Sequence, residues 1–426
     1  MRIWTILLTA LCLFLGAADQ RAAAQLSVPS VQLPDTARTL PTLPGLDTDP
    51  LGIVGDQLTQ LRLDRIAALV RANRDSIDRD DRGDPAVRGV LVATGVDAVM
   101  LARAANKGFA LIDRERIAGL DLDIARFRTP EGRSLGRARK QLAKLLPGAD
   151  VDVDHIYFAS GRDAAGVGAL PQAVLAATSG GGTATLGLID GGVAAHPAVA
   201  GHVEQRGFAT GAPSASRHGT AVASLLIGSG SVRGAAPGQR LLAADVYGTD
   251  PAGGNASAIA RALGWLVQNR VAVTTISLVG PDNKLLAVAV ARAQQRGMLI
   301  VAAVGNDGPA APPAYPASYR GVLAVTGVDA RNRALPEAGR ALHVDFAAPG
   351  DGVLAATGAA DTGRLRGTSF AAPLVAGRLA LLYPAPAIDR IGPAIAALVI
   401  EARDLGKKGR DKIHGHGLIC GTCGGR

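Results

Sequence analysis

The feature that most constrains the fold is a series of short, continuously apolar segments that alternate with segments of helical spacing through the C-terminal half of the chain. The apolar segments predict strands at residues 185–189, 241–246, 271–278, 298–304 and 322–328. The segments between and after them predict helices at residues 218–227, 256–268, 284–296 and 369–382. Strands that are apolar on both faces and alternate with helices are typical of a parallel sheet covered by helices on each side. We therefore predict an α/β domain.

A smaller domain is predicted ahead of the α/β domain. Its pattern indicates strands near residues 87–93, 109–113, 120–124 and 151–156, with helices near residues 97–105 and 134–145. The order β-α-β-β-α-β is that of a ferredoxin-like α+β domain. Before it, apolar residues at helical spacing predict one more helix from Gln57 to Ala72.

Four polar residues mark one end of the predicted parallel sheet. Asp190 ends the first strand, Asn306 follows the strand at 298–304, and His218 and Ser369 each begin a helix. Ligands bind beyond the carboxyl ends of the strands in such sheets, so we expect these side chains to lie close together. Each residue alone is common in turns and helix caps, and only the combination indicates chemistry.

Three segments carry a resemblance to a known family. They are Gly-Leu-Ile-Asp-Gly-Gly-Val at residues 187–193, His-Gly-Thr-Ala-Val-Ala at 218–223 and Gly-Thr-Ser-Phe-Ala-Ala-Pro at 367–373. Their order along the chain, Asp, His, Ser, and their sequences resemble the subtilisin-like serine proteases (subtilases, peptidase S8 family) over residues 183–419. An esterase of the α/β-hydrolase type would need a Gly-x-Ser-x-Gly elbow and the order Ser, Asp, His, and neither occurs.

The resemblance implies a subtilisin-like parallel sheet and a catalytic role for each marked residue. Ser369 would be the nucleophile, His218 its base, and Asp190 the carboxylate that orients the imidazole. The Asn306 side-chain amide and the backbone N–H of Ser369 would form the oxyanion hole. The implied activity is that of a serine endopeptidase (hydrolase) acting on protein or peptide substrates through an acyl-enzyme.

The substrate wall implied by the resemblance contains one departure from the family pattern. It comprises Ser277, Leu278, Val279, Gly280 and Gly305. Valine stands at 279 where the family has glycine, and its side chain can face either the cleft or the core. Glycine also replaces the family's serine or threonine at position 191, which keeps a close approach, and activity should survive that change.

The resemblance also implies a self-processed zymogen. Residues 56–158 would be a propeptide that inhibits the enzyme intramolecularly, residues 159–182 a processing linker, and residues 183–419 the catalytic domain. The alternative is a catalytically silent subtilase that binds peptides or a partner through the same cleft. We expect a monomer.

The N-terminus has the features of an export signal. Residues 3–18 are mostly apolar, and Ala-Ala-Ala-Gln at 22–25 is a small-x-small cleavage pattern. We predict a signal peptide at 1–24, a Pro-rich extended linker at 25–55, and a secreted or periplasmic protein. The apolar run is shorter than a bilayer-spanning helix, so we expect no stable membrane anchor.

The remaining features bear on metals and nucleic acids. Cys420 and Cys423 in the tail at 420–426 predict a local disulfide, while His414 and His416 nearby leave a metal site open. No cofactor is required, and the segment 228–233 is too short for the calcium-binding loop of many relatives; weak calcium sites elsewhere stay open. The net charge is +9, but the arginines are scattered and aromatic residues are only 3%, so we expect no nucleic-acid binding.

Overall fold

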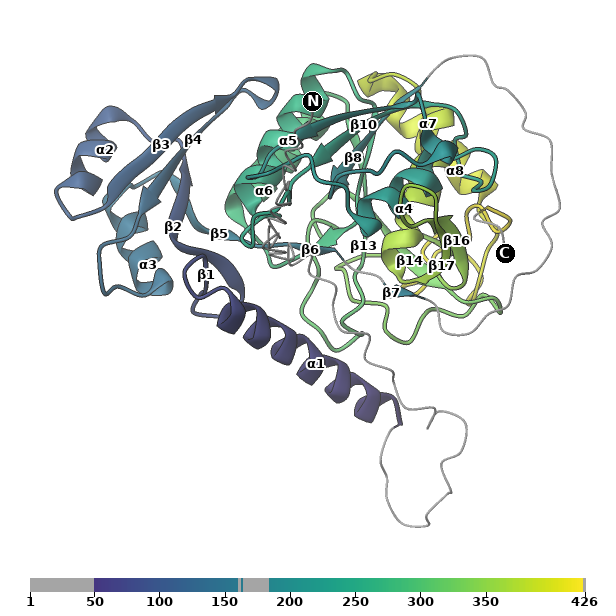
Figure 1. The fold of residues 1–426 in the computed structure, drawn as a ribbon, viewed down its shortest axis with the longest axis horizontal. Helices are drawn as coiled ribbons and strands as arrows, with labels where there is room; N and C mark the ends of the chain where they lie inside the picture. The colour runs from purple at the N-terminus through teal and green to yellow at the C-terminus, as the bar shows by residue number, and fades with distance from the viewer. Residues whose placement is uncertain (1–49, 160–161, 164–183, 424–426) are drawn as a thin grey trace, which may run out of the picture.

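The structure, a computed structural model, describes residues 50–159, 162–163 and 184–423. The predicted signal peptide lies outside the described residues, as do residues 25–49 of the predicted linker and most of the predicted processing linker. No helix in the described part of the chain is both long and apolar enough to cross a membrane. Figure 1 shows a small N-terminal domain beside a larger C-terminal one.

The larger domain is built on a seven-stranded sheet in which every pair of neighbours is parallel. Its order is β15-β14-β13-β11-β8-β10-β9. The strands are β8 (Thr185–Asp190), β9 (Val203–Gly207), β10 (Arg240–Asp245), β11 (Val273–Ile276), β13 (Leu299–Ala303), β14 (Leu323–Val328) and β15 (Phe346–Pro349). The predicted parallel α/β sheet is confirmed.

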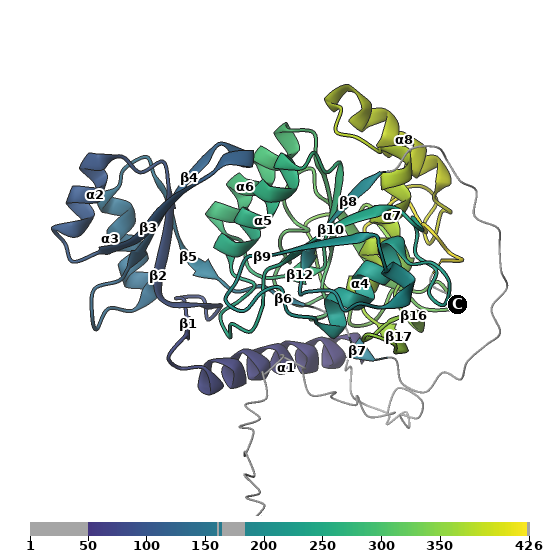
Figure 2. The same ribbon diagram turned by 45° about the horizontal axis from the view of Figure 1, so that its top comes forward.

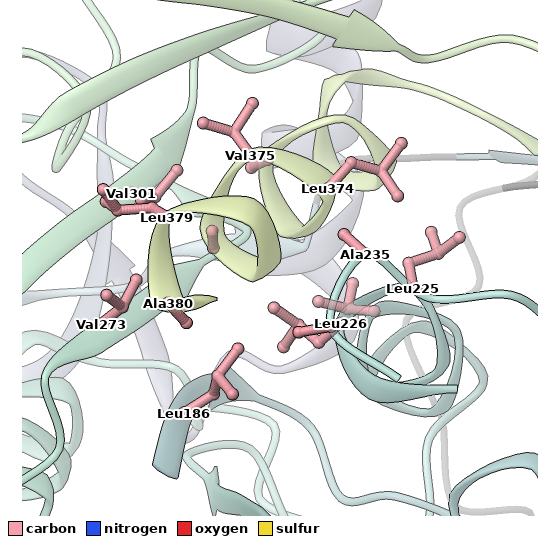
Figure 3. Packing of buried hydrophobic residues seen from close by; sticks show 14 of the residues in the cluster. Leu186, Leu225, Leu226, Ala235, Val273, Val301, Leu374, Val375, Leu379 and Ala380 are labelled. Atoms are coloured by element: carbon pink, nitrogen blue, oxygen red, sulfur yellow. The ribbon is translucent and has the colours of Figure 1, made fainter. Parts of the chain in front are cut away.

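Both faces of this sheet are covered by helices (Figures 1 and 2). On one face lie α4 (Arg217–Ile227) and α7 (Ala372–Leu382), with α8 (Ile391–Glu401) outside them; on the other lie α5 (Ala256–Gln268) and α6 (Lys284–Gln295). In Figure 3, Leu186 and Val301 from the sheet meet Leu226 of α4 and Leu379 of α7. Ile189 belongs to the core on the opposite face, with α5 and α6. Apolar side chains on both faces are what the continuous apolar runs predicted.

The N-terminal domain has the predicted ferredoxin-like order. Its elements are β2 (Pro85–Thr94), α2 (Ala98–Ala105), β3 (Ala110–Ile117), β4 (Leu122–Arg128), α3 (Leu135–Leu145) and β5 (Asp150–His155). The strands pair antiparallel in the order β3-β4-β2-β5, and the short β1 (Ile77–Arg79) also pairs with β2. One face of the sheet packs on α2 and α3.

The other face of this small sheet packs on α5 and α6 of the larger domain. Ile117 and Leu120 share a core with these helices. A Cβ atom at Gly119 would collide with the carbonyl oxygen of Gly264 in α5, so glycine is needed for the contact. Asp152 and Asp154 of β5 complete the interface because each accepts a hydrogen bond at a helix N-terminus.

Helix α1 (Pro50–Ala72) begins inside the segment predicted to be an extended linker, seven residues before the helix start expected at Gln57. The linker prediction is therefore wrong for residues 50–55. Proline is well tolerated at the first helical position, because its missing N–H has no partner there in any helix. Side chains at Leu58, Ile66 and Leu69 of this helix are buried.

Candidate active site

Asp190 and His218 form a partly buried pair at the carboxyl end of β8. Asp190 is fully buried, and both of its carboxylate oxygens lie 2.9 Å from His218 Nδ1. Its Oδ1 also accepts a hydrogen bond of 2.7 Å from the Gly191 N–H. A carboxylate that accepts from Nδ1–H fixes the imidazole tautomer in which Nε2 can take a proton.

Close backbone packing sets this geometry. Ser216 caps α4 by accepting a 2.8 Å hydrogen bond from the Gly219 N–H. A Cβ atom at Gly219 would collide with the Gly191 carbonyl, and one at Gly191 would collide with the Ser216 hydroxyl. The glycine at 191 therefore lets the end of β8 lie directly against the start of α4.

Ser369 lies in a 3₁₀ turn, η4 (Thr368–Phe370), and α7 begins only at Ala372. The helix predicted at 369–382 thus starts with this tighter turn. The Ser369 hydroxyl donates to the Ser277 carbonyl at 3.1 Å, and the Ser277 hydroxyl donates back to the Ser369 carbonyl at 3.0 Å. The ring of the next residue, Phe370, packs against the His218 ring, with 5.5 Å between the two ring centres. Asp190 and His218 are thus paired, and the residue that follows Ser369 packs against the His218 ring.

Asn306 supplies a hydrogen-bond donor beside Ser369. Its Oδ1 accepts a 3.0 Å hydrogen bond from the Thr368 N–H, which fixes the orientation of the amide. Its Nδ2 is buried and has no hydrogen-bond partner among the described residues. Buried donors are almost always paired in folded proteins, so an unpaired one at this place indicates a group held ready for a ligand atom.

The substrate wall carries an extended segment of the N-terminal part of the chain. Strand β6 (Phe158–Ala159) pairs antiparallel with β12 (Leu278–Val279), placing Phe158 opposite Val279. On the other side, Ile156 bridges to Asn255. The segment is thus a middle strand, the geometry by which clefts bind extended peptides through backbone hydrogen bonds.

Tyr157 anchors this strand. It is fully buried, its N–H donates to the Gly254 carbonyl at 2.9 Å, and its hydroxyl donates to the Pro281 carbonyl at 2.8 Å. Its own carbonyl accepts a 2.8 Å hydrogen bond from the Tyr247 hydroxyl. Burial raises the pKa of Tyr157 and that of Tyr247 well above the usual value for tyrosine, so both hydroxyls remain neutral donors at neutral pH. Tyr157, Tyr247 and Gly254 were not predicted; the Gly253-Gly254 pair before helix 256–268 was the available signal.

Val279 faces the cleft, which decides between the two orientations left open. Its Cγ1 lies 3.3 Å from where a Cβ atom at Gly305 would be, and it lines a pocket of about 410 Å³ together with Gly305 and Phe158. Gly305 has a φ of +87°, a conformation that favours glycine. Gly280 packs under the Tyr157 ring, whereas Leu278 is buried in the core with α5 and α6.

A second pairing lies on the Ser369 side of the cleft. Strand β7 (Arg162–Asp163) pairs antiparallel with β17 (Thr362–Arg366), placing Arg162 opposite Arg366. Strand β17 leads directly into the turn that holds Ser369. The two described segments that border residues 160–161 are therefore paired with the two chain segments that flank the nucleophile.

The C-terminal cysteines are paired with each other. Cys420 and Cys423 are joined by a disulfide, which removes the thiolates that a site with His414 and His416 would use. Within residues 50–159, 162–163 and 184–423, no group of three or more His, Cys, Asp or Glu side chains is arranged to hold a metal ion.

A family model and several known proteins match this chain. The model of the subtilase family matches residues 181–417. Subtilisin BL of Lederbergia lenta is 37% identical over 205 residues, which cover 46% of this chain and 74% of that protein. The minor extracellular protease Epr of Bacillus subtilis is 31% identical over 251 residues, covering 55% of this chain and 37% of Epr. The chain therefore spans little more than a third of the length of Epr.

A solved structure is similar over most of the chain. The crystal structure of fervidolysin from Fervidobacterium pennivorans, described as a keratinolytic enzyme related to subtilisin, superposes with a TM-score of 0.64. The match covers 80% of this chain and 61% of fervidolysin at 19% identity. At this identity the likeness concerns the fold alone.

Proposed function

Because the chain belongs to the subtilase family, we propose that it is a serine endopeptidase that hydrolyses protein or peptide substrates. The observation that carries this proposal is the buried, unpaired Nδ2 of Asn306, fixed by the Thr368 N–H next to Ser369. An oxyanion needs donors that are in place before it forms, and this donor is held in place next to Ser369.

Each proposed residue has a definite step in the reaction. The Ser369 Oγ attacks the scissile carbonyl carbon while His218 Nε2 takes the hydroxyl proton, and Asp190 stabilises the imidazolium that results. The oxyanion accepts hydrogen bonds from Asn306 Nδ2 and from the Ser369 N–H. The imidazolium then donates its proton to the leaving amine nitrogen as the C–N bond breaks. Water hydrolyses the acyl-serine ester with His218 again as the base.

The proposed enzyme is made as a zymogen, with the N-terminal domain as its intramolecular inhibitor. Support comes from the strand pairing of Phe158 and Ala159 on one side of Ser369 and of Arg162 and Asp163 on the other. Pairing of both segments beside the nucleophile favours cleavage of one of the peptide bonds between residues 159 and 162. These bonds lie within the segment expected to be processed.

The contacts between the two domains favour an inhibitor that also assists folding. Asp154 Oδ1 accepts a 3.0 Å hydrogen bond from the Ser257 N–H at the start of α5, and Asp152 Oδ2 accepts one of 3.0 Å from the Lys284 N–H at the start of α6. Carboxylates at helix N-termini satisfy unpaired N–H groups and interact favourably with the helix dipole. They would stabilise both helices while the parallel sheet forms.

Export, oligomeric state and cofactor use complete the proposal. A predicted signal at residues 1–24, together with a relative named as an extracellular protease, supports secretion or a periplasmic location. We propose a monomer that requires no metal or organic cofactor.

The experiment compares casein hydrolysis by the wild-type chain with that of Ser369→Ala and His218→Ala. Activity should fall to background in both variants, and a fluorophosphonate probe should label only the wild type and not Ser369→Ala. A chain that binds peptides but takes up no probe would favour the alternative, a catalytically silent binding module. Hydrolysis by Ser369→Ala at the wild-type rate would make the triad assignment wrong.

A further inference from the structure

Helix α1 packs on the loop that carries Asn306. Leu58 lies on Gly308, two residues after Asn306, and a Cβ atom at position 308 would lie 2.8 Å from Leu58 Cδ1. Gly308 has a φ of +86°, so the position favours glycine and leaves a flat backbone surface for the leucine. The helix therefore contacts the segment immediately beyond the oxyanion donor.

Two arginines of α1 hold the residue between Asn306 and Gly308. Arg65 Nη2 lies 2.7 Å from Asp307 Oδ1, and Arg62 Nε lies 3.5 Å from Asp307 Oδ2. Arg62 Nη2 also lies 2.8 Å from Asp84 Oδ1 in the N-terminal domain. The side chains of this group are 14–29% exposed, so solvent screens them less than a surface pair. Arg62 thus links the two domains through charge.

The same helix covers the outer side of the strand in the cleft. The Arg65 guanidinium lies 5.7 Å from the centre of the Phe158 ring, in a cation–π contact. Leu69 is buried in a cluster with Ile156 and with Phe158. Phe158 is therefore paired with the substrate wall along its backbone and closed in by α1 through its side chain.

We propose that helix α1 is a latch that keeps the cut N-terminal part bound in the cleft, with the Asp307–Gly308 surface as its docking site. This inference rests on the proposed zymogen function. Leu58, Arg62 and Arg65 are spaced four and three residues apart and share one helix face. This face places the leucine on Gly308 and both arginines on Asp307. Cleavage of one of the peptide bonds between residues 159 and 162 leaves these contacts intact. Activity therefore appears only when α1 leaves the Asp307–Gly308 surface.

The latch is tested in the full-length chain by separating cleavage from activation. Cleavage is followed by gel, and activity by hydrolysis of a small peptide substrate. In Arg62→Ala/Arg65→Ala, we expect the chain to be cut at the wild-type rate and the delay between cutting and activity to shorten about tenfold, from the loss of both partly buried ion pairs to Asp307 and of one cation–π contact. The control is Arg71→Ala/Arg74→Ala, whose arginines are exposed and form no ion pair within the described residues. An unchanged delay in the first variant would overturn the latch.

A second measurement does not depend on catalysis. In the Ser369→Ala background, hydrogen exchange reports on the backbone amides of residues 58–70 and 305–308. Both segments should exchange faster when Arg62 and Arg65 are replaced, and at the parent rate in the Arg71/Arg74 control. Equal exchange in all three chains would refute the docking of α1. A wild-type chain that is neither cut nor active would refute the proposed function, and the exchange result would still report on the latch.

Discussion

Replacing Val279 by glycine should widen the substrate preference of the enzyme. The isopropyl group of Val279 lies against Gly305 at the wall of the pocket, where a β-branched side chain cannot easily rotate away. Removal of its three side-chain carbon atoms leaves room for about three further carbon atoms of the substrate. Their burial is worth about 2.4 kcal/mol. Pocket discrimination of this size is worth about 1–3 kcal/mol, which corresponds to about tenfold or more in the ratio of kcat/KM for a large over a small side chain.

The assay is a peptide library varied near the scissile bond. The ratio of kcat/KM for phenylalanine over alanine should rise about tenfold in Val279→Gly. Val279→Thr keeps the branched shape and is the matched control, so its profile should follow the wild type. If Val279→Gly gave the wild-type profile, the valine would not shape the pocket and the reasoning would fail.

Three further predictions concern the oxyanion donor, the N-terminal domain and metals. Asn306→Ala should lower kcat by about 10²–10³, the magnitude known for oxyanion donors of this family and adopted here, with little change in KM in steady-state assays. Burial raises the pKa of Asp80, but hydrogen bonds from His155 and from two backbone N–H groups outweigh it and hold this pKa well below its usual value. A depressed pKa stabilises the folded state above the ordinary pKa of about 4 and loses that effect as pH falls toward the folded-state pKa. In the Ser369→Ala background, Asp80→Asn should therefore lower the free energy of unfolding in urea by about 2 kcal/mol at pH 7 and by less below about pH 4. An equal loss at both pH values would count against the Asp80–His155 pair. Treatment with EDTA should leave both activity and Tm unchanged, and a clear drop in Tm would reveal a structural metal.

The apolar pattern predicted the fold well where strands are buried on both faces. It missed β9 (Val203–Gly207), because this edge strand is largely exposed and carries a polar sequence. It missed β15 (Phe346–Pro349), because four residues ending in proline give too short an apolar run. It also placed the start of α1 too late, because prolines and glycines obscure the helical spacing before Gln57.

The site residues could be named from sequence because short motifs fix them locally, whereas their contacts depend on pairing between distant segments. The direction of Val279 follows from its register with Phe158, about 120 residues earlier in the chain, which no local pattern encodes. The contact of Arg65 with Asp307 joins residues 242 positions apart and was likewise beyond sequence reasoning. By contrast, the motif around Asn306 was sufficient to place its amide beside Ser369.

If Ser369 is the nucleophile of an enzyme that cuts its own chain, the N-terminal sequence and mass of the purified protein should differ from those of its Ser369→Ala variant. We predict that the wild type yields a catalytic domain whose first residue lies between positions 160 and 162, because Ala159 and Arg162 are paired on opposite sides of Ser369. The Ser369→Ala chain should keep its N-terminal domain covalently attached. A Ser369→Ala chain cut at the same bond and at the same rate as the wild type would contradict the account.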